Sequence, residues 1–127
     1  MRVALDTNRL TDLLRGDGNL AAWLGSCDEV WIPLMVLGEI EAGFLGGTQQ
    51  HRNANLLHRL LSKPTVAALL PSRETAVYYA RLFVQLKRAG TPIPDNDLWI
   101  AALALQHDLT LVTRDRHFAR IPQLLRA

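Results

Sequence analysis

The stretch PIPDNDLWIAALALQHDLTLVTRD, residues 92–115, holds the pattern that decides the fold. Pro94 and an N-cap-like Asp95 open a helix that we expect to run to about His107. The apolar run from Leu109 to Val112 follows and predicts a short buried strand. A helix that leads directly into a buried strand is typical of α/β proteins.

The rest of the chain alternates in the same way. Further buried strands are predicted at residues 3–5, 29–32 and 65–69. Helices are predicted at residues 8–15, 34–45, 49–62 and 71–89, with another after the break at 16–18 and a short one at 116–119. Helical crossovers between strands favour parallel pairing. We therefore expect an α/β fold, a three-layer α/β/α sandwich with a mainly parallel central sheet.

Length and composition limit the organisation of the chain. Its 127 residues contain no repeat, low-complexity tract or linker, so we expect one domain over residues 1–127. No apolar stretch approaches the roughly 18 residues that span a bilayer, and the start does not resemble a secretory signal. The lone Cys27 excludes an internal disulfide and a thiolate zinc site. We expect a cytoplasmic protein with no membrane association.

Charge gives a weaker signal. The net charge is +2 and the pI is about 9.1, which permits contact with nucleic acid without requiring it. Near the C-terminus, Arg114, Arg116, Arg120 and Arg126 face only Asp115 along the sequence. That end could meet phosphates, and a solvated basic helix and tail is an equally good interpretation.

Four acidic residues fall where the predicted topology places the carboxyl edge of the sheet. Asp6 ends the first strand, and Asp115 lies just beyond the last one. Glu39 is in the first two turns of the helix that leaves the second strand, and Asp97 is in the first turn of the helix that runs into the last strand. Sites in parallel sheets are usually built at this edge.

Four carboxylates at one edge favour a metal site. Two unit charges about 4 Å apart repel by roughly 4 kcal/mol at an effective dielectric of 20. The acids are therefore spread apart and solvated, or partly protonated, or gathered around a divalent cation. With oxygen donors and no predicted set of His or Cys ligands, Mg²⁺ or Mn²⁺ is favoured over zinc. Such ions support phosphodiester cleavage by metal-dependent nucleases.

Each acid also has a structural interpretation. Asp6, Asp97 and Asp115 could cap or begin helices, and Glu39 could be a solvated helix residue. Periodicity alone does not separate Glu39 from Glu41. Asp95 similarly competes with Asp97, although its position after Pro94 suits a structural role.

Three segments, taken in order, resemble a known family. They are LDTNRL at residues 5–10, IPLMVLGEIEAGF at 32–44 and TPIPDNDLWIAALALQHDLTLVTRDRHF at 91–118. Together they resemble PIN-domain proteins, and specifically the VapC toxins of bacterial and archaeal type II toxin-antitoxin systems. The last segment is the most specific of the three.

The resemblance implies the residues of the site. Asp6, Glu39, Asp97 and Asp115 match the acidic pocket that holds the metal and catalyses the reaction. The resemblance favours Glu39 over Glu41, because Glu39 stands four positions before Gly43. It favours Asp97 over Asp95, because Asp97 directly precedes the L-W-I-A-A run. The remaining positions form two groups: supporting residues Thr7, Asn8 and Thr113, and candidate RNA-binding residues Arg114, Arg116 and His117. Val36 stands where many relatives carry Thr or Ser.

The resemblance also implies a function. It predicts an endoribonuclease, dependent on Mg²⁺ or Mn²⁺, that cuts a structured RNA such as a tRNA or rRNA loop and inhibits translation. Expected partners are the RNA, a cognate antitoxin of the VapB type that blocks the pocket, and a second copy in a homodimer. A non-catalytic PIN-like module that binds RNA or protein is the alternative, although such modules usually lack one or more acids. A phosphoryl-transfer domain of the haloacid dehalogenase type is disfavoured, because Asn8 stands where it needs an acid.

Overall fold

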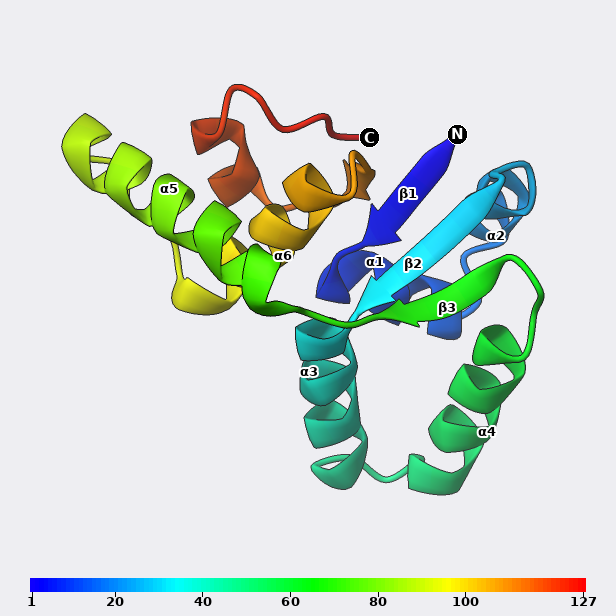
Figure 1. Cartoon of the computed structure of the whole chain (residues 1–127). Helices are drawn as coiled ribbons and strands as arrows, with labels where there is room; N and C mark the ends of the chain where they lie inside the picture. The colour runs from blue at the N-terminus through cyan, green and yellow to red at the C-terminus, as the bar shows by residue number, and fades with distance from the viewer.

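The computed structural model describes all 127 residues, and a four-stranded parallel sheet forms its centre (Figure 1). The strand order is β3-β2-β1-β4, and every pair is parallel. The strands are β1 (Arg2–Leu5), β2 (Glu29–Pro33), β3 (Val66–Leu69) and β4 (Thr110–Val112). The predicted α/β fold with a parallel central sheet is confirmed.

Helices connect all the strands. They are α1 (Thr7–Leu14), α2 (Gly18–Gly25), α3 (Leu34–Leu45), α4 (Gln50–Leu61), α5 (Arg73–Ala89) and α6 (Asp95–Gln106), followed by the 3₁₀ helix η1 (Arg116–Arg120). The predicted ranges agree to within a few residues. One detail is wrong: Asp95 does not cap α6, because the helix begins at Asp95 itself and Pro94 holds the N-cap position.

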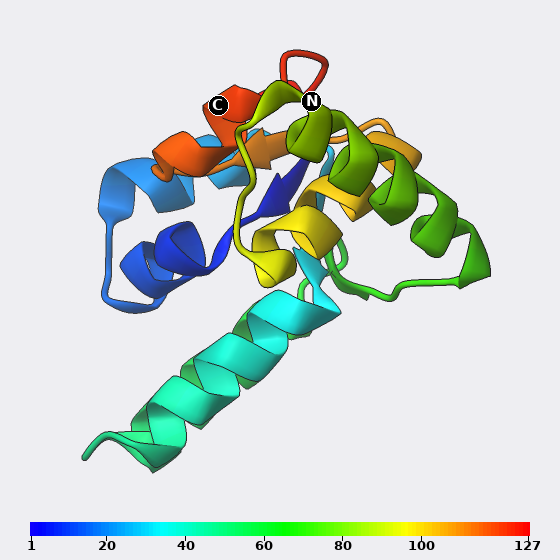
Figure 2. The same cartoon turned by 90° about the vertical axis from the view of Figure 1, so that its left-hand side faces the viewer.

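The strand order decides on which face each helix packs. The connections from β1 to β2 and from β2 to β3 step across the sheet in one direction, whereas the connection from β3 to β4 returns past β1 in the other. Because such crossovers are right-handed, the two directions place their helices on opposite faces. Figure 2 shows α1 and α2 on one side of the sheet and α5 and α6 on the other. The helices α3 and α4 extend from the body and run in opposite directions along the chain (Figure 1).

The core explains the apolar runs seen in the sequence. Val3, Ala4 and Leu5 of β1 are fully buried because β1 lies between two strands and under helices on both faces. The chain end runs beside the outer edge of β4. The N–H of Leu111 donates to the carbonyl of Leu125 at 2.8 Å, and the carbonyl of Leu111 accepts from the N–H of Ala127 at 2.9 Å. This segment satisfies backbone groups that an edge strand would otherwise expose. None of the helices combines the length and apolar character needed to cross a membrane.

Candidate active site at the switch point of the sheet

The candidate site lies where the strand order reverses, between the carboxyl ends of β1 and β4. The two strands are neighbours in the sheet, although one begins the chain and the other nearly ends it. The backbone N–H of Asp6 donates to the carbonyl of Val112 at 3.0 Å, which joins the two strand ends. Parallel sheets bind ligands at such topological switch points, because the loops diverge there and leave a crevice.

Asp6 is the most deeply buried acid of the site, with 5% of its surface exposed. Its Oδ1 accepts from the backbone N–H of Thr7 at 2.8 Å and so caps α1, while its Oδ2 accepts from the hydroxyl of Thr113 at 2.7 Å. Burial raises the pKa of Asp6 above its ordinary value, and the hydrogen bond from Thr113 partly opposes that rise. The capping interpretation and the site interpretation of Asp6 therefore hold together.

Asp97 lies in the first turn of α6. Its carboxylate lies close to His117 of η1 and to Asp115, the N-cap residue of η1. Its Oδ2 lies 3.2 Å from Nδ1 of His117, and the same ring nitrogen lies 3.1 Å from Oδ1 of Asp115. Burial raises the pKa of Asp97, the hydrogen bond from His117 lowers it, and the charges of Asp6 and Asp115 raise it further. These electrostatic effects place Asp6, Asp97 and Asp115 within one acidic cluster.

Asp115 also has a structural task, because it caps η1. Its Oδ1 accepts from the backbone N–H of His117 at 2.9 Å, and its own backbone N–H donates to the hydroxyl of Thr113 at 2.9 Å. Thr113 thus bridges Asp6 and the backbone of Asp115. The supporting role predicted for Thr113 has a direct geometric basis in these two hydrogen bonds.

Glu39 lies at the border of this cluster. Its side chain is exposed on α3, and the side-chain amide of Asn96, at the start of α6, donates to its Oε1. Its charge contributes to the raised pKa of Asp6. Glu41 is also exposed but has no such contact with α6. Asn96 is a contact residue that the sequence did not single out, and no spacing pattern marks it.

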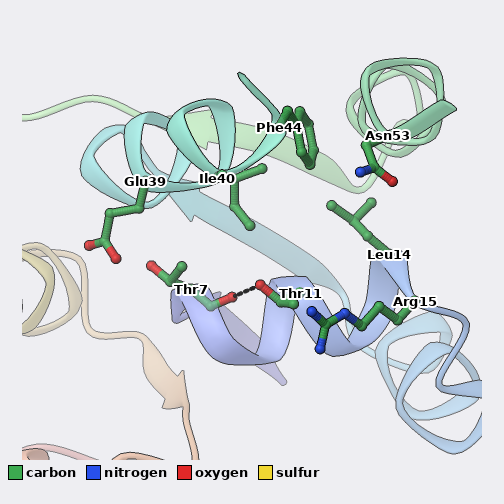
Figure 3. Close-up of a pocket in the computed structure, with 9 residues that line it drawn as sticks. Thr7, Thr11, Leu14, Arg15, Glu39, Ile40, Phe44 and Asn53 are labelled. Atoms are coloured by element: carbon green, nitrogen blue, oxygen red, sulfur yellow. Dashed lines mark hydrogen bonds between the residues drawn. The ribbon is translucent and has the colours of Figure 1, made fainter. Parts of the chain in front are cut away.

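A cavity of about 280 Å³ begins at Glu39 and runs between α1, α3 and α4 (Figure 3). Thr7 lies at its Glu39 end, whereas Phe44 and Asn53 lie at the far end. The hydroxyl of Thr7 is buried and has no hydrogen-bond partner, and the same is true of Oδ1 of Asn8. Both residues were predicted to support the site, and each keeps one buried side-chain oxygen without a hydrogen-bond partner in the protein.

The candidate RNA-binding residues differ in their surroundings. Arg116 is exposed and forms no ion pair, whereas the guanidinium of Arg114 pairs with Asp12 of α1 at 2.8 and 3.0 Å. His117 faces the carboxylates of Asp97 and Asp115. The sequence predicted no histidine among the ligand-type groups, and the structure differs here. The short 3₁₀ turn, which brings residues 115 and 117 onto one side, is the signal that could have placed it there.

The donor set suits a divalent cation. One atom each from Asp97, Asp115 and His117 lies within 4.8 Å of the other two, and these side chains are half-buried. The pKa values of Asp6 and Asp97 are raised because the hydrogen bonds from Thr113 and His117 do not offset burial and the neighbouring charges, and a bound divalent cation would offset them.

Comparison with known proteins assigns the family. The model of the PIN domain matches residues 3–124. Toxin FitB of Neisseria gonorrhoeae is 34% identical over 89% of this chain and 87% of its own length, and Ribonuclease VapC5 of Mycobacterium tuberculosis is 32% identical over 74% and 70%. The structure of VapBC2 from Rickettsia felis, bound to a DNA fragment from its promoter, superposes with a TM-score of 0.87 and 29% identity over 100% of this chain and 98% of that one. The chain therefore belongs to the PIN-domain family, and the VapC ribonucleases are its relatives within it.

Proposed function

We propose that this chain is a metal-dependent endoribonuclease and the toxin of a type II toxin-antitoxin system, built as one PIN domain over residues 1–127. The observation that carries the proposal is the cluster of Asp6, Asp97 and Asp115 at the switch point of the sheet, with Glu39 at its border. Capping accounts for Asp6 and Asp115, but nothing in the packing of the fold requires Asp97 and Glu39 beside them, since the mutual repulsion of these acids opposes folding.

The side chains divide the work of such a reaction. Asp97 and Asp115, together with Asp6 and Glu39, supply the oxygen ligands for Mg²⁺ or Mn²⁺. Thr113 fixes the orientation of the Asp6 carboxylate, and the hydroxyl of Thr7 and Oδ1 of Asn8, which have no partner in the protein, would support the bound ion or its water. A bound divalent ion supplies a water nucleophile and stabilises the charge that develops on the scissile phosphate.

RNA is the substrate that the surroundings of the cluster favour. Arg116 is exposed next to Asp115 and carries no counterion, so it is available to a phosphate. Arg114 and His117 are engaged with carboxylates and reach a phosphate only by leaving them. A structured RNA such as a tRNA or rRNA loop, whose cleavage inhibits translation, is the proposed target.

Two protein partners complete the proposal. Solved structures of relatives are complexes of VapB with VapC, including one from nontypeable Haemophilus influenzae, and this supports a VapB-type antitoxin as the cognate partner. A homodimer is supported by the apolar side chains that α5 leaves exposed, namely Val77, Phe83 and Val84.

Cleavage of total cellular RNA by the purified chain tests the proposal. Discrete cuts are expected in Mn²⁺ or Mg²⁺ and not in EDTA. Asp97→Asn should abolish them, whereas Asp95→Asn, the same change two residues earlier in the same helix, should not, because Asp95 instead accepts a hydrogen bond from the hydroxyl of Tyr79.

A second matched pair tests the border residue. Glu39→Gln should lower the rate of cleavage, and Glu41→Gln should leave it unchanged. If RNA binds tightly to the wild-type chain but stays intact in both metals, the nuclease proposal is wrong and the chain is a non-catalytic RNA-binding module.

A further inference from the structure

His117 is held in place by its own backbone and by its neighbour. The backbone N–H of His117 donates to Oδ1 of Asp115 at 2.9 Å. The next residue, Phe118, is completely buried and anchors η1 in the core. The ring then lies against the carboxylates of Asp97 and Asp115, with 40% of the side chain exposed. A residue that only touched phosphates would not need its ring placed against two carboxylates.

The ring nitrogen that faces the cluster is Nδ1. It lies 3.2 Å from Oδ2 of Asp97 and 3.1 Å from Oδ1 of Asp115. The other ring nitrogen, Nε2, forms no hydrogen bond with the protein and can carry the proton of a neutral ring. In the metal-free chain Nδ1 donates to the carboxylate of Asp97, and when an ion takes the place of that proton the neutral ring presents Nδ1 as a ligand beside two carboxylates.

Asp6 is less open than these three groups. Both of its carboxylate oxygens already accept hydrogen bonds from the protein, and its surface is almost entirely covered. It is better placed to complete the coordination of an ion already held by more open groups than to be the first ligand that an arriving ion meets. The accessible donors are therefore two carboxylates and one imidazole.

We propose that His117 is a nitrogen ligand of the catalytic ion, bound through Nδ1 together with Asp97 and Asp115, and that it biases the site towards Mn²⁺ over Mg²⁺. This inference rests on the proposed metal-dependent function. Mg²⁺ binds through oxygen and retains its water, whereas imidazole nitrogen is a good ligand for transition ions. Replacing one oxygen ligand by nitrogen thus favours Mn²⁺ selectively.

The test uses the free chain with Mn²⁺ alone and needs no RNA. Electron spin echo spectroscopy of the bound Mn²⁺ should show modulation from a directly bound imidazole ¹⁴N. His117→Ala should abolish the modulation, and His51→Ala, which removes an exposed histidine from α4, should preserve it. The variant His117→Gln keeps most of the side-chain volume and a donor oxygen, so it reports on the nitrogen if the alanine variant folds poorly.

Affinities give a second readout. In His117→Ala and His117→Gln, the affinity for Mn²⁺ should fall by at least about tenfold, because even the loss of a residue that only orients a ligand costs about that much. The affinity for Mg²⁺, measured by competition, should change much less, so that the preference for Mn²⁺ shrinks. Equal losses for both ions, bound Mn²⁺ without ¹⁴N modulation, or no binding of either ion by the wild-type chain would each overturn the assignment. If bound Mn²⁺ shows the ¹⁴N modulation but the chain leaves RNA uncut, the nuclease proposal is overturned while the assignment of His117 as a ligand is supported.

Discussion

Asp12 and Arg114 form a two-point ion pair between α1 and the loop that follows β4. Nε of Arg114 lies 2.8 Å from Oδ2 of Asp12, Nη2 lies 3.0 Å from Oδ1, and Arg9 adds a third contact to the same carboxylate at 2.9 Å. The pair lowers the pKa of Asp12 and raises that of Arg114. It ties the loop that carries Thr113 and Asp115 to α1, the helix that Asp6 caps.

The ion pair predicts that Arg114 acts through the loop. Asp12→Ala and Arg114→Ala should each reduce the rate of RNA cleavage by a similar factor, and the double variant should be little worse than either one, because the two side chains serve one interaction. Rates of cleavage at saturating RNA measure this. Loss of RNA affinity in Arg114→Ala that Asp12→Ala does not share would show instead that Arg114 contacts a phosphate.

Arg116 is predicted to contact RNA directly, because it is exposed beside the cluster and has no counterion. In an inactive Asp97→Asn background, Arg116→Ala should weaken binding of different RNAs to a similar extent and reduce the slope of log affinity against log salt by about 1. Arg81→Ala is the matched control, since Arg81 lies over the ring of Tyr78 on α5. An unchanged slope in Arg116→Ala would remove Arg116 from the interface.

Most of the fold was predictable from local patterns. Buried apolar runs and helix breaks such as the Gly16 turn, where φ is +98°, mark the elements, and right-handed crossovers then define the faces of the sheet. The N-cap of α6 was misjudged because Asp95 and Pro94 both favour a helix start, and one-residue shifts at helix ends leave little trace in sequence.

The candidate site was predictable in part. The acids could be assigned to one edge because topology alone places strand ends together. The partners of Arg114 and His117 could not be predicted. Asp12 is 102 residues away from Arg114 along the chain, and Asp97 approaches His117 only because α6 packs against η1. Contacts of this kind depend on three-dimensional packing that no periodicity encodes.

Thr113 is predicted to hold the site together through its hydroxyl. Thr113→Val keeps the shape of the side chain but leaves Oδ2 of Asp6 and the N–H of Asp115 without that partner, and it should lower the free energy of unfolding by about 1–3 kcal/mol. It should also weaken Mn²⁺ binding. Thr113→Ser restores the hydroxyl and should recover most of both properties. Urea unfolding and metal titration measure them, and a valine variant as stable and as metal-competent as the wild type would contradict the assignment.

Asp97 is predicted to destabilise the metal-free fold at neutral pH. Its folded-state pKa is raised above 3.8, mainly by burial, so the unfolded chain loses this proton first as the pH rises. Stability therefore falls across the window from 3.8 to the raised value and stays lower above it. Asp97→Asn, which cannot ionise, should be more stable than the wild type at pH 7 in EDTA, and the difference should vanish below the ordinary pKa of aspartate.

Asp12 is the matched control for Asp97, because its ionisation should change the stability of the fold in the opposite direction. Because Arg114 lowers the folded-state pKa of Asp12, that carboxylate stabilises the fold above its ordinary pKa, and this contribution is lost as the pH falls through the lowered value. Asp12→Asn should therefore be less stable than the wild type at pH 7 in EDTA. Urea unfolding of both variants between pH 3 and pH 7 makes the comparison. Destabilisation by Asp97→Asn at pH 7 would mean that the contacts of Asp97 with His117 outweigh its burial and the repulsion from Asp6 and Asp115.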